Sequence, residues 1–168
     1  MRTRSGQSGV PAPDAAWNEI VPGLWMGGLE FRGGAGQREY AVVRGEFDLV
    51  QTLLRLPGHG PDRGVRHQVW PIPDGPLDGT QLAGVMRLAQ AAGEALDEGL
   101  TVLVRCRHGY NRSGLVVAHA LVRRGHAAED AIRLIRSRRS PWALHNELFV
   151  EYLRAGLSTA RLLEELAE

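Results

Sequence analysis

Residues 100–114 read Leu-Thr-Val-Leu-Val-Arg-Cys-Arg-His-Gly-Tyr-Asn-Arg-Ser-Gly, and this stretch decides the fold. It begins with an apolar, β-branched run, residues 100–104, which is too short for a helix and typical of a strand covered on both faces. Residues 113–122 are apolar at helical spacing and are followed by Gly125, which predicts a helix that ends there. The sequence therefore predicts a short loop that connects a buried strand to the N-terminus of a helix.

The loop after the predicted strand combines Cys106 with Gly109, Arg112 and Ser113. A short loop that closes on a helix N-terminus points several backbone N–H groups at one place, where the helix dipole also favours negative charge. A cysteine at the base of this loop should ionise more readily than a free thiol, and the thiolate is the nucleophilic form. Gly109 permits the bend, Arg112 can hold two phosphoryl oxygens in a planar fork, and Ser113 can donate to the sulfur. These residues predict an anion site with a cysteine nucleophile and no requirement for a metal, and the alternative is an ordinary buried cysteine.

The segments on both sides of this stretch predict an α/β domain. Further strands are predicted at residues 20–28, 47–54 and 65–71. Helices are predicted at residues 80–98, 127–136, 143–154 and 158–167, and one or two helical turns at residues 38–43. Strands followed by long helices indicate a small, largely parallel central sheet flanked by helices. Ligands of such sheets bind beyond the carboxyl ends of the strands, which is where the loop is expected.

Composition and charge narrow the class of protein. The 168 residues fit one domain, 43% of them are hydrophobic, and the formal net charge is +1. A charge so close to balance argues against a general nucleic-acid or membrane-surface binder. All 20 basic residues are arginines, so every cation can act as a planar fork for oxyanions.

Three further features bear on the domain limits and the location of the protein. Residues 1–16 are rich in Gly, Ser, Pro and Arg, and we expect them to be a disordered leader before a domain at residues 17–168. Cys106 is the only cysteine, which excludes an intramolecular disulfide and fits a reducing compartment. The sequence has no apolar run typical of a secretory signal or a membrane span, so we expect a cytoplasmic protein that does not bind membranes.

The loop resembles the Cys-x-x-Gly-x-x-Arg-Ser signature of the protein tyrosine phosphatases, in particular of their dual-specificity branch. Residues 21–28 resemble the opening strand of that family, and residues 138–153, with Asn146 and Phe149, resemble its closing helical region. The resemblance implies the dual-specificity phosphatase fold and hydrolysis of phosphotyrosine in a phosphorylated protein, with phosphoserine and phosphothreonine as candidate further substrates. It also implies a phosphocysteine intermediate, an aspartate that serves as general acid and then as general base, and no cofactor.

Two aspartates are candidates for the general acid. Asp74 follows the predicted strand at residues 65–71 and resembles the acid of the family in its position relative to the cysteine, and Asp78 lies four residues further on. Both could instead be turn formers, because Asp beside Gly and Pro is a common turn residue. We expect Asp74 to be the acid.

The remaining residues of the loop are candidate substrate contacts, and they are Arg107, His108, Gly109, Tyr110 and Asn111. We expect the side chains of Arg107 and His108 to point outward, either toward the substrate beyond its phosphate or toward solvent. Tyr110 and Asn111 line the same loop, and Asn111 can brace it by hydrogen bonds to the backbone.

Arg105 departs from the family pattern and leaves two alternative functions open. The family usually has His before the cysteine, where it orders the loop and tunes the thiol, although a cation there can still favour the thiolate. The His-Gly-Tyr-Asn-Arg run, flanked by Arg105 and Arg107, also resembles the loop of RNA 5′-triphosphatases of the same superfamily. The extra cations would suit a polyphosphate or a phosphoinositide. The near-zero net charge argues against a long RNA footprint, so we do not expect nucleic acid as a partner. A pseudophosphatase, which binds phosphate without turnover, is the other alternative, and Arg105 is its only support.

Four arginines and one histidine in the C-terminal half are not expected to take part in the chemical step. Four arginines are expected to form a solvated helix face, with a second anion pocket near the site as the alternative; they are Arg133, Arg136, Arg138 and Arg139. His145 is expected to be structural or at the surface.

Overall fold

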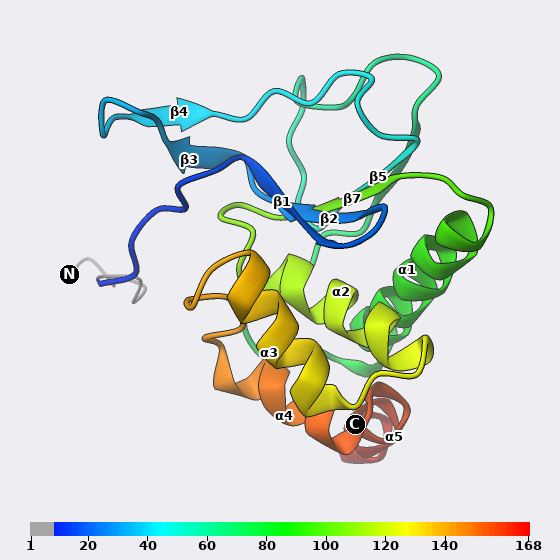
Figure 1. Ribbon diagram of the computed structural model, residues 1–168. Coiled ribbons are helices and arrows are strands. Elements are labelled where there is room, and N and C mark those ends of the chain that lie inside the picture. The colour runs from blue at the N-terminus through cyan, green and yellow to red at the C-terminus, as the bar shows by residue number, and fades with distance from the viewer. Residues whose placement is uncertain (1–8) are drawn as a thin grey trace.

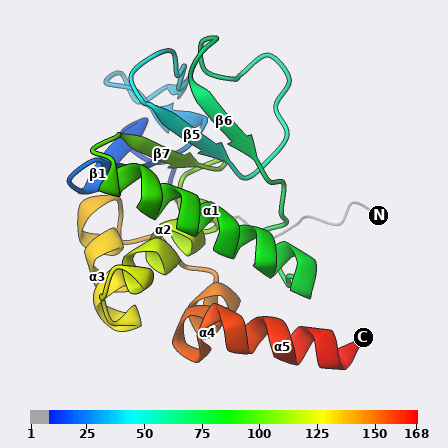
Figure 2. The same ribbon diagram turned by 90° about the vertical axis from the view of Figure 1, so that its right-hand side faces the viewer.

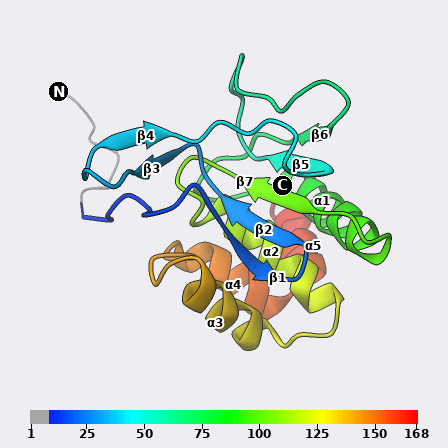
Figure 3. The same ribbon diagram turned by 45° about the horizontal axis from the view of Figure 1, so that its top comes forward.

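A five-stranded, mostly parallel sheet lies at the centre of the computed structural model, which describes residues 9–168 (Figure 1). Across the sheet the strand order is β1 (Trp17–Val21), β2 (Leu24–Gly27), β7 (Val102–Arg105), β5 (Leu49–Thr52) and β6 (Arg66–Val69). The β1–β2 pair is antiparallel, and the other three pairs are parallel. Figure 3 shows this order, with β7 in the middle of the sheet. The predicted α/β class with a small, largely parallel central sheet is confirmed.

The five helices of residues 9–168 lie on one side of the sheet (Figure 2). They are α1 (Gly79–Asp97), α2 (Arg112–Arg123), α3 (Ala128–Arg138), α4 (Glu147–Ala155) and α5 (Leu157–Ala167). The apolar stripe of α1 and strand residues such as Met26, Leu49 and Val104 belong to one buried core between the sheet and the helices. Within residues 9–168, no helix combines the length and the apolar character that crossing a membrane requires.

The opposite face of the sheet is covered by chain that contains a second, two-stranded sheet, β3 (Glu30–Arg32) and β4 (Arg38–Tyr40). A smaller apolar cluster lies there, in which Phe47 packs edge-on against Trp17 and Trp25 at ring-centroid distances of 5.4 and 5.9 Å. Leu103 of β7 belongs to this cluster, whereas its neighbours in β7 belong to the core on the helix side. The central strand is therefore covered on both faces, as its uninterrupted apolar run predicts.

Two of the predicted elements are wrong. The single strand predicted over residues 20–28 is a hairpin, because Pro22 and Gly23, with a φ of +83° at Gly23, reverse the chain between β1 and β2. The helical turns predicted for residues 38–43 are absent, and β4 occupies Arg38–Tyr40 instead, paired with β3. Ala41 and Val43 are buried whereas Tyr40 and Val42 are exposed, and this alternation is the pattern of an extended chain rather than of a helix.

Part of the predicted disordered leader, residues 1–16, is bonded to the domain. Residues 1–8 lie outside the described residues, but residues 11–16, which we call the N-terminal segment, run along the domain. The carbonyl of Pro13 accepts a hydrogen bond from the backbone of Arg32 at 2.7 Å, and the carbonyl of Ala16 accepts one from Gly28 at 3.1 Å. Disorder is therefore the wrong expectation for this segment, because its backbone groups are bonded to the ordered domain.

Candidate active site

The loop of residues 106–111, called the cysteine loop below, joins the carboxyl end of β7 to the start of α2. It lies at the middle of the sheet, because β7 is flanked by β2 on one side and β5 on the other. This is the edge of a parallel sheet at which ligands bind. The structure therefore places the loop where the strand and helix predictions expected it.

The backbone of the cysteine loop is bonded on its outer side. The carbonyl oxygens of residues 107–110 all accept hydrogen bonds: the Arg139 guanidinium donates to two of them, at 2.8 and 3.2 Å, and the backbones of Leu29 and Leu144 donate to the others, at 2.8 and 3.0 Å. None of the backbone N–H groups of residues 107–111 donates to another group within residues 9–168. Because the carbonyls are held outward, these N–H groups are left to bind an anion, as in other backbone nests.

Two glycines allow the loop to lie directly against the end of β2. Gly109 has a φ of +73°, and a Cβ placed there would lie 2.5 Å from the carbonyl group of Gly27. A Cβ on Gly28 would lie 2.6 Å from the carbonyl oxygen of Arg107. Gly109 thus meets two requirements at once, a left-handed backbone, which the predicted bend already required, and a close backbone contact.

Cys106 and Arg112 line the same small pocket. The Cys106 side chain is buried, with 3% of the residue exposed, and its Sγ lies 3.3 Å from the Oγ of Ser113. Arg112 donates one hydrogen bond, from Nη1 to the carbonyl of Ile72 at 3.3 Å. Its Nε is buried and has no hydrogen-bond partner among residues 9–168. A buried donor without a partner costs free energy, so this N–H indicates where a bound oxyanion would be held.

Asp74 belongs to this pocket and Asp78 does not. The pocket is lined by Asp74, Cys106, Arg107, His108, Tyr110, Asn111, Arg112 and His145. Asp78 instead caps α1: its Oδ1 accepts from the backbone of Gln81 at 2.7 Å, and the Gln81 side chain accepts from the Asp78 backbone at 2.9 Å. This reciprocal pair is a capping box, which is a structural role.

The Asp74 carboxylate contacts two amide side chains. Asn111 donates to its Oδ2 at 3.0 Å and Asn146 donates to its Oδ1 at 2.8 Å. His145 also lines the pocket, where it is partly exposed and bonds Trp142 and Asn111, so the expected structural or surface residue lies beside the candidate acid. The prediction of a helix from residue 143 obscured this part of the site, because α4 begins only at residue 147 with Asn146 as its N-cap. The Ser-Pro pair at residues 140–141 and the capping preference of Asn were the signals that could have revealed it.

Arg105 lies on the other face of the sheet from the helices. It shares that face with Leu103, because side chains alternate along a strand. Only 2% of Arg105 is exposed, and it donates to the Oγ1 of Thr52 at 3.0 Å and to the carbonyl of His59. Burial lowers the pKa of Arg105 to about 10. In place of the usual His, this sequence thus has a buried cation that ties the strand before the loop to β5 and to the chain around residue 59.

The four arginines near α3 do not form one solvated face. Arg133 and Arg138 are exposed, and the half-buried Arg136 donates to two backbone carbonyls at 3.0 Å each. Arg139 is buried, and besides the cysteine loop it bonds the carbonyl of Ala15 and the side chain of Asn18, each at 2.8 Å. Burial lowers the pKa of Arg139 to about 10, an effect opposed by the negative charges that Cys106 and Tyr110 can carry. The donors of Arg139 hold protein groups, so the expected solvated face and the alternative anion pocket both fail there.

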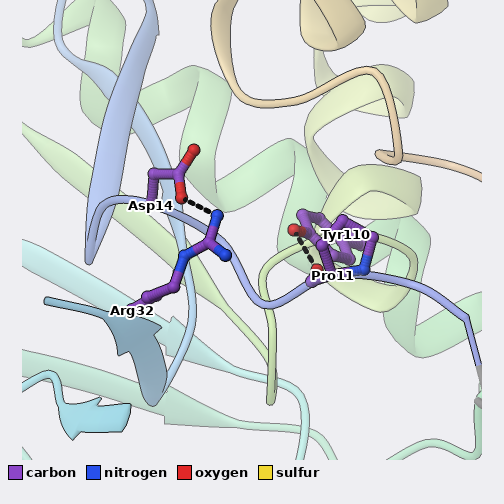
Figure 4. Close-up of polar contacts among 4 residues, drawn as sticks. All are labelled: Pro11, Asp14, Arg32 and Tyr110. Atoms are coloured by element: carbon purple, nitrogen blue, oxygen red, sulfur yellow. Dashed lines mark hydrogen bonds and ion pairs between the residues drawn. The ribbon is translucent and has the colours of Figure 1, made fainter. Parts of the chain in front are cut away.

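The N-terminal segment contacts the cysteine loop through Tyr110 (Figure 4). The Tyr110 hydroxyl donates to the carbonyl of Pro11 at 2.8 Å, and Asp14 of the same segment forms an ion pair with Arg32 at 2.8 Å. Burial raises the pKa of Tyr110. Tyr110 therefore lies between the pocket on one side and the N-terminal segment on the other.

The outer rim of the pocket is formed by Arg107 and His108. Arg107 is half exposed and lies 3.5 Å from the buried carboxylate of Glu30, which is also 3.6 Å from Arg38. Burial lowers the pKa of His108, an effect that Glu30 opposes and the neighbouring arginines reinforce. The outward position expected for Arg107 agrees with this arrangement, and its charge is shared with Glu30.

Comparison with known proteins finds a family model and solved structures that resemble this chain. The family model described as the dual specificity phosphatase catalytic domain matches residues 83–156. Human DUSP28 has a TM-score of 0.67 at 22% identity, with 89% of this chain and 99% of that chain covered. Tk-PTP in its G95A mutant form is 30% identical over 70% of this chain and 81% of that chain, with a TM-score of 0.55. PTPMT1 in complex with PI(5)P has a TM-score of 0.61 at 17% identity, over 87% of this chain and 99% of that chain. None of the curated proteins matches the sequence significantly.

The family match, the fold and the cysteine loop lead to one conclusion. The chain belongs to the cysteine-dependent protein tyrosine phosphatase superfamily, in its dual-specificity branch. It is a cysteine-based phosphatase.

Proposed function

We propose that this phosphatase hydrolyses phosphotyrosine, and also phosphoserine and phosphothreonine, in protein substrates through a phosphocysteine intermediate. The observation that carries the proposal is the arrangement of Cys106 beneath unbonded N–H groups of the loop, with the unpartnered Nε of Arg112 and the carboxyl of Asp74 in the same pocket. Each of these groups has a place in transfer of a phosphoryl group to sulfur.

In the first step, the Cys106 thiolate attacks phosphorus and the bond from phosphorus to the leaving oxygen breaks. Protonated Asp74 gives its proton to that oxygen, so the substrate hydroxyl leaves uncharged. The loop N–H groups and the Arg112 fork hold the three remaining phosphoryl oxygens as negative charge shifts among them. The products of this step are phosphocysteine, the free hydroxyl and the Asp74 carboxylate.

In the second step, water attacks the phosphocysteine. The Asp74 carboxylate accepts a proton from that water, and the bond from sulfur to phosphorus breaks, which releases inorganic phosphate and restores the thiolate. Ser113 can donate a hydrogen bond to the departing sulfur, since the two atoms lie 3.3 Å apart. Every proton is accounted for by Asp74 and water, so we propose that the cycle runs without a metal.

The rim of the pocket supports a dual specificity. Of the eight residues that line it, Asp74 and His145 come from outside the cysteine loop and the first residue of α2. The small number of side chains around the loop favours a shallow phosphate site, which side chains shorter than tyrosine would also reach. We therefore propose phosphoserine and phosphothreonine as additional substrates.

A phosphoinositide or another substrate with a second phosphate is the next candidate. Arg107, half exposed at the rim, is the observation that favours it. PTPMT1, which shares the fold, has been crystallised with PI(5)P. Glu30 already neutralises part of the charge of Arg107 and Arg38, and for this reason we place such substrates second.

The test is hydrolysis of an aryl phosphate at mildly acid pH in the presence of EDTA, with Cys106→Ser as the matched variant. We expect the wild type to be active and the variant to lose more than about 10⁴-fold in kcat, because the nucleophile is removed. The variant should still bind vanadate, since the N–H groups and Arg112 remain. Turnover near the wild-type value in Cys106→Ser would exclude the phosphocysteine. Vanadate binding by an inactive wild type would instead identify a pseudophosphatase.

The same assay then ranks the substrates. Release of phosphate from phosphotyrosine, phosphothreonine and phosphoserine peptides is compared with release from PI(5)P vesicles and from a 5′-triphosphate RNA. We expect the peptides to be hydrolysed with the highest kcat/KM. A preference for PI(5)P or the RNA would move the second candidate to first place.

A further inference from the structure

We infer that Asn146 and Asn111, with His145 behind them, are positioning residues that hold the Asp74 carboxyl at the pocket and thereby control proton delivery to the leaving group. The inference rests on the proposed role of Asp74 as general acid. The sequence did not assign this role to any of the three side chains. They come from the cysteine loop and from the segment before α4, both far from Asp74 along the chain.

The position of Asp74 depends on contacts from outside its own segment. Asp74 is exposed and lies between β6 and α1, in a stretch without regular secondary structure. Its two carboxylate oxygens are held separately, Oδ1 by Asn146 at 2.8 Å and Oδ2 by Asn111 at 3.0 Å. An exposed aspartate in a turn would otherwise sample several rotamers, so two donors from two different elements define where this carboxyl lies.

The hydrogen-bond pattern fixes the orientation of every group in this cluster. The Nδ1 of His145 donates to the carbonyl of Trp142 at 2.8 Å, since a carbonyl can only accept. In the neutral ring Nε2 is then an acceptor, and it faces the Nδ2 of Asn111 at 3.2 Å. The second N–H of the same Asn111 amide donates to Asp74, and its Oδ1 accepts from the backbone of Asn146 at 2.9 Å. Because all its polar groups are bonded, the Asn111 amide cannot rotate by half a turn without losing three hydrogen bonds.

This arrangement leaves the Asp74 carboxyl free to carry and to accept a proton. Each carboxylate oxygen has two lone-pair directions, and one amide contact on each oxygen occupies one of them. The second position on each oxygen remains for the proton that Asp74 delivers in the first step and recovers from water in the second. The amides thus orient the acid without competing for its proton.

Asn146 allows the positioning role to be separated from a structural one. Its Oδ1 caps α4 by accepting from the backbone of Leu148 at 3.1 Å, and its Nδ2 donates to Asp74. Asn146→Ser keeps a good N-cap and removes the donor, so α4 should remain intact. Asn146→Asp also keeps the cap and places a second carboxylate beside Asp74. His145→Phe keeps a ring and loses the acceptor, whereas His145→Gln retains an acceptor for Asn111.

The experiment measures kcat for a series of aryl phosphates whose leaving phenols differ in acidity. Asp74→Asn, the reference, should lose about 10²-fold or more with poor leaving groups and little with good ones, because only poor ones need a proton. We expect Asn146→Ser to lose roughly tenfold with poor leaving groups and less than about twofold with good ones, and Asn146→Asp to lose more. His145→Phe should show the same selective loss of kcat with poor leaving groups as Asn146→Ser, but a smaller one. His145→Gln should have a kcat near that of the wild type. Asp78→Asn, which keeps the cap of α1, is the control and should match the wild type throughout.

The outcomes separate this inference from the proposed function. If kcat of Asp74→Asn varies with the acidity of the leaving phenol as it does in the wild type, Asp74 is not the general acid. The positioning inference alone would be overturned if kcat of Asp74→Asn fell steeply with poorer leaving groups while kcat of Asn146→Ser and Asn146→Asp varied with the leaving group as in the wild type. Equal losses for all leaving groups in the Asn146 variants would also overturn it, since they would report a general change in the loop. Thermal unfolding of each variant shows whether α4 is intact.

Discussion

On its outer side, the cysteine loop has every carbonyl of residues 107–110 bonded, whereas on its inner side the N–H groups of residues 107–111 have no partner within residues 9–168. The outer bonds join protein groups to one another and therefore contribute to the free energy of folding. The inner donors have no protein acceptor among these residues and are therefore available to an anion. A substitution on the outer side should thus lower stability and activity together, and one on the inner side should lower activity alone.

Two arginines show the same contrast. Arg139 bonds the cysteine loop, the N-terminal segment and β1, so its donors serve the fold. Arg112 makes one long contact to Ile72 and keeps a buried Nε without a partner in the described part of the chain. The sequence pattern around both is Arg followed by Ser, and only the position after the cysteine loop distinguishes them. Burial and bonding, not residue type, decide which arginine is available to a ligand.

The largest effect is expected from Arg112→Lys, on the inner side. Lysine keeps the charge and loses the planar fork, so we expect kcat/KM to fall by about 10²–10³-fold. The free energy of unfolding should stay within about 0.5 kcal/mol of the wild type, because the fork makes only one hydrogen bond to another protein group within residues 9–168. Aryl phosphate kinetics and urea unfolding measure the two quantities. A stability loss as large as that of an outer-side variant would remove the distinction between the sides.

Arg139→Met should give the next effect, on the outer side. Methionine replaces the stem and removes the donors to two loop carbonyls and to Ala15, which we expect to lower the free energy of unfolding by about 2–4 kcal/mol. Activity should fall by roughly tenfold, because the loop carbonyls are no longer held outward. The exposed neighbour Arg138, changed to Met, is the matched control and should change neither quantity appreciably. Loss of activity in Arg139→Met without loss of stability would place Arg139 on the inner side after all.

The inner side was largely predictable from sequence because its signals are local. An apolar run followed by a cysteine, a glycine and an arginine before a helix defines the loop, the strand and the helix within about twenty residues. Asp74 was favoured over Asp78 by its position, and the capping box that occupies Asp78 was visible as Asp followed three residues later by Gln.

The outer side could not be predicted because its contacts join distant residues. Arg139 reaches a loop that lies thirty residues earlier and a segment more than a hundred residues earlier. A run of arginines after a helix has the composition of a solvated face, and only the fold shows that one of them is buried. The same holds for Asn146, whose partner Asp74 lies 72 residues away, and for Arg105, whose bonds to Thr52 and His59 depend on the strand order.

The smallest effect is expected from Tyr110→Phe, where the outer side meets the N-terminal segment. The change removes one hydrogen bond to the carbonyl of Pro11, which should lower the free energy of unfolding by about 1 kcal/mol. Activity should fall by less than about threefold, because Arg139 still holds the loop. Asp14→Asn is the control: its ion pair with Arg32 is between two exposed side chains, 82% and 49% exposed, and such pairs contribute little.

A shortened chain tests whether the effect of Tyr110→Phe on stability depends on the N-terminal segment. In a protein that lacks residues 1–11, the partner of the Tyr110 hydroxyl is gone, so Tyr110→Phe should have no further effect on stability. If the N-terminal segment braces the cysteine loop as its contacts indicate, the two changes will therefore be strongly non-additive. Additive losses in urea unfolding would mean that the hydroxyl is stabilised by water, and the brace would then consist of Arg139 alone.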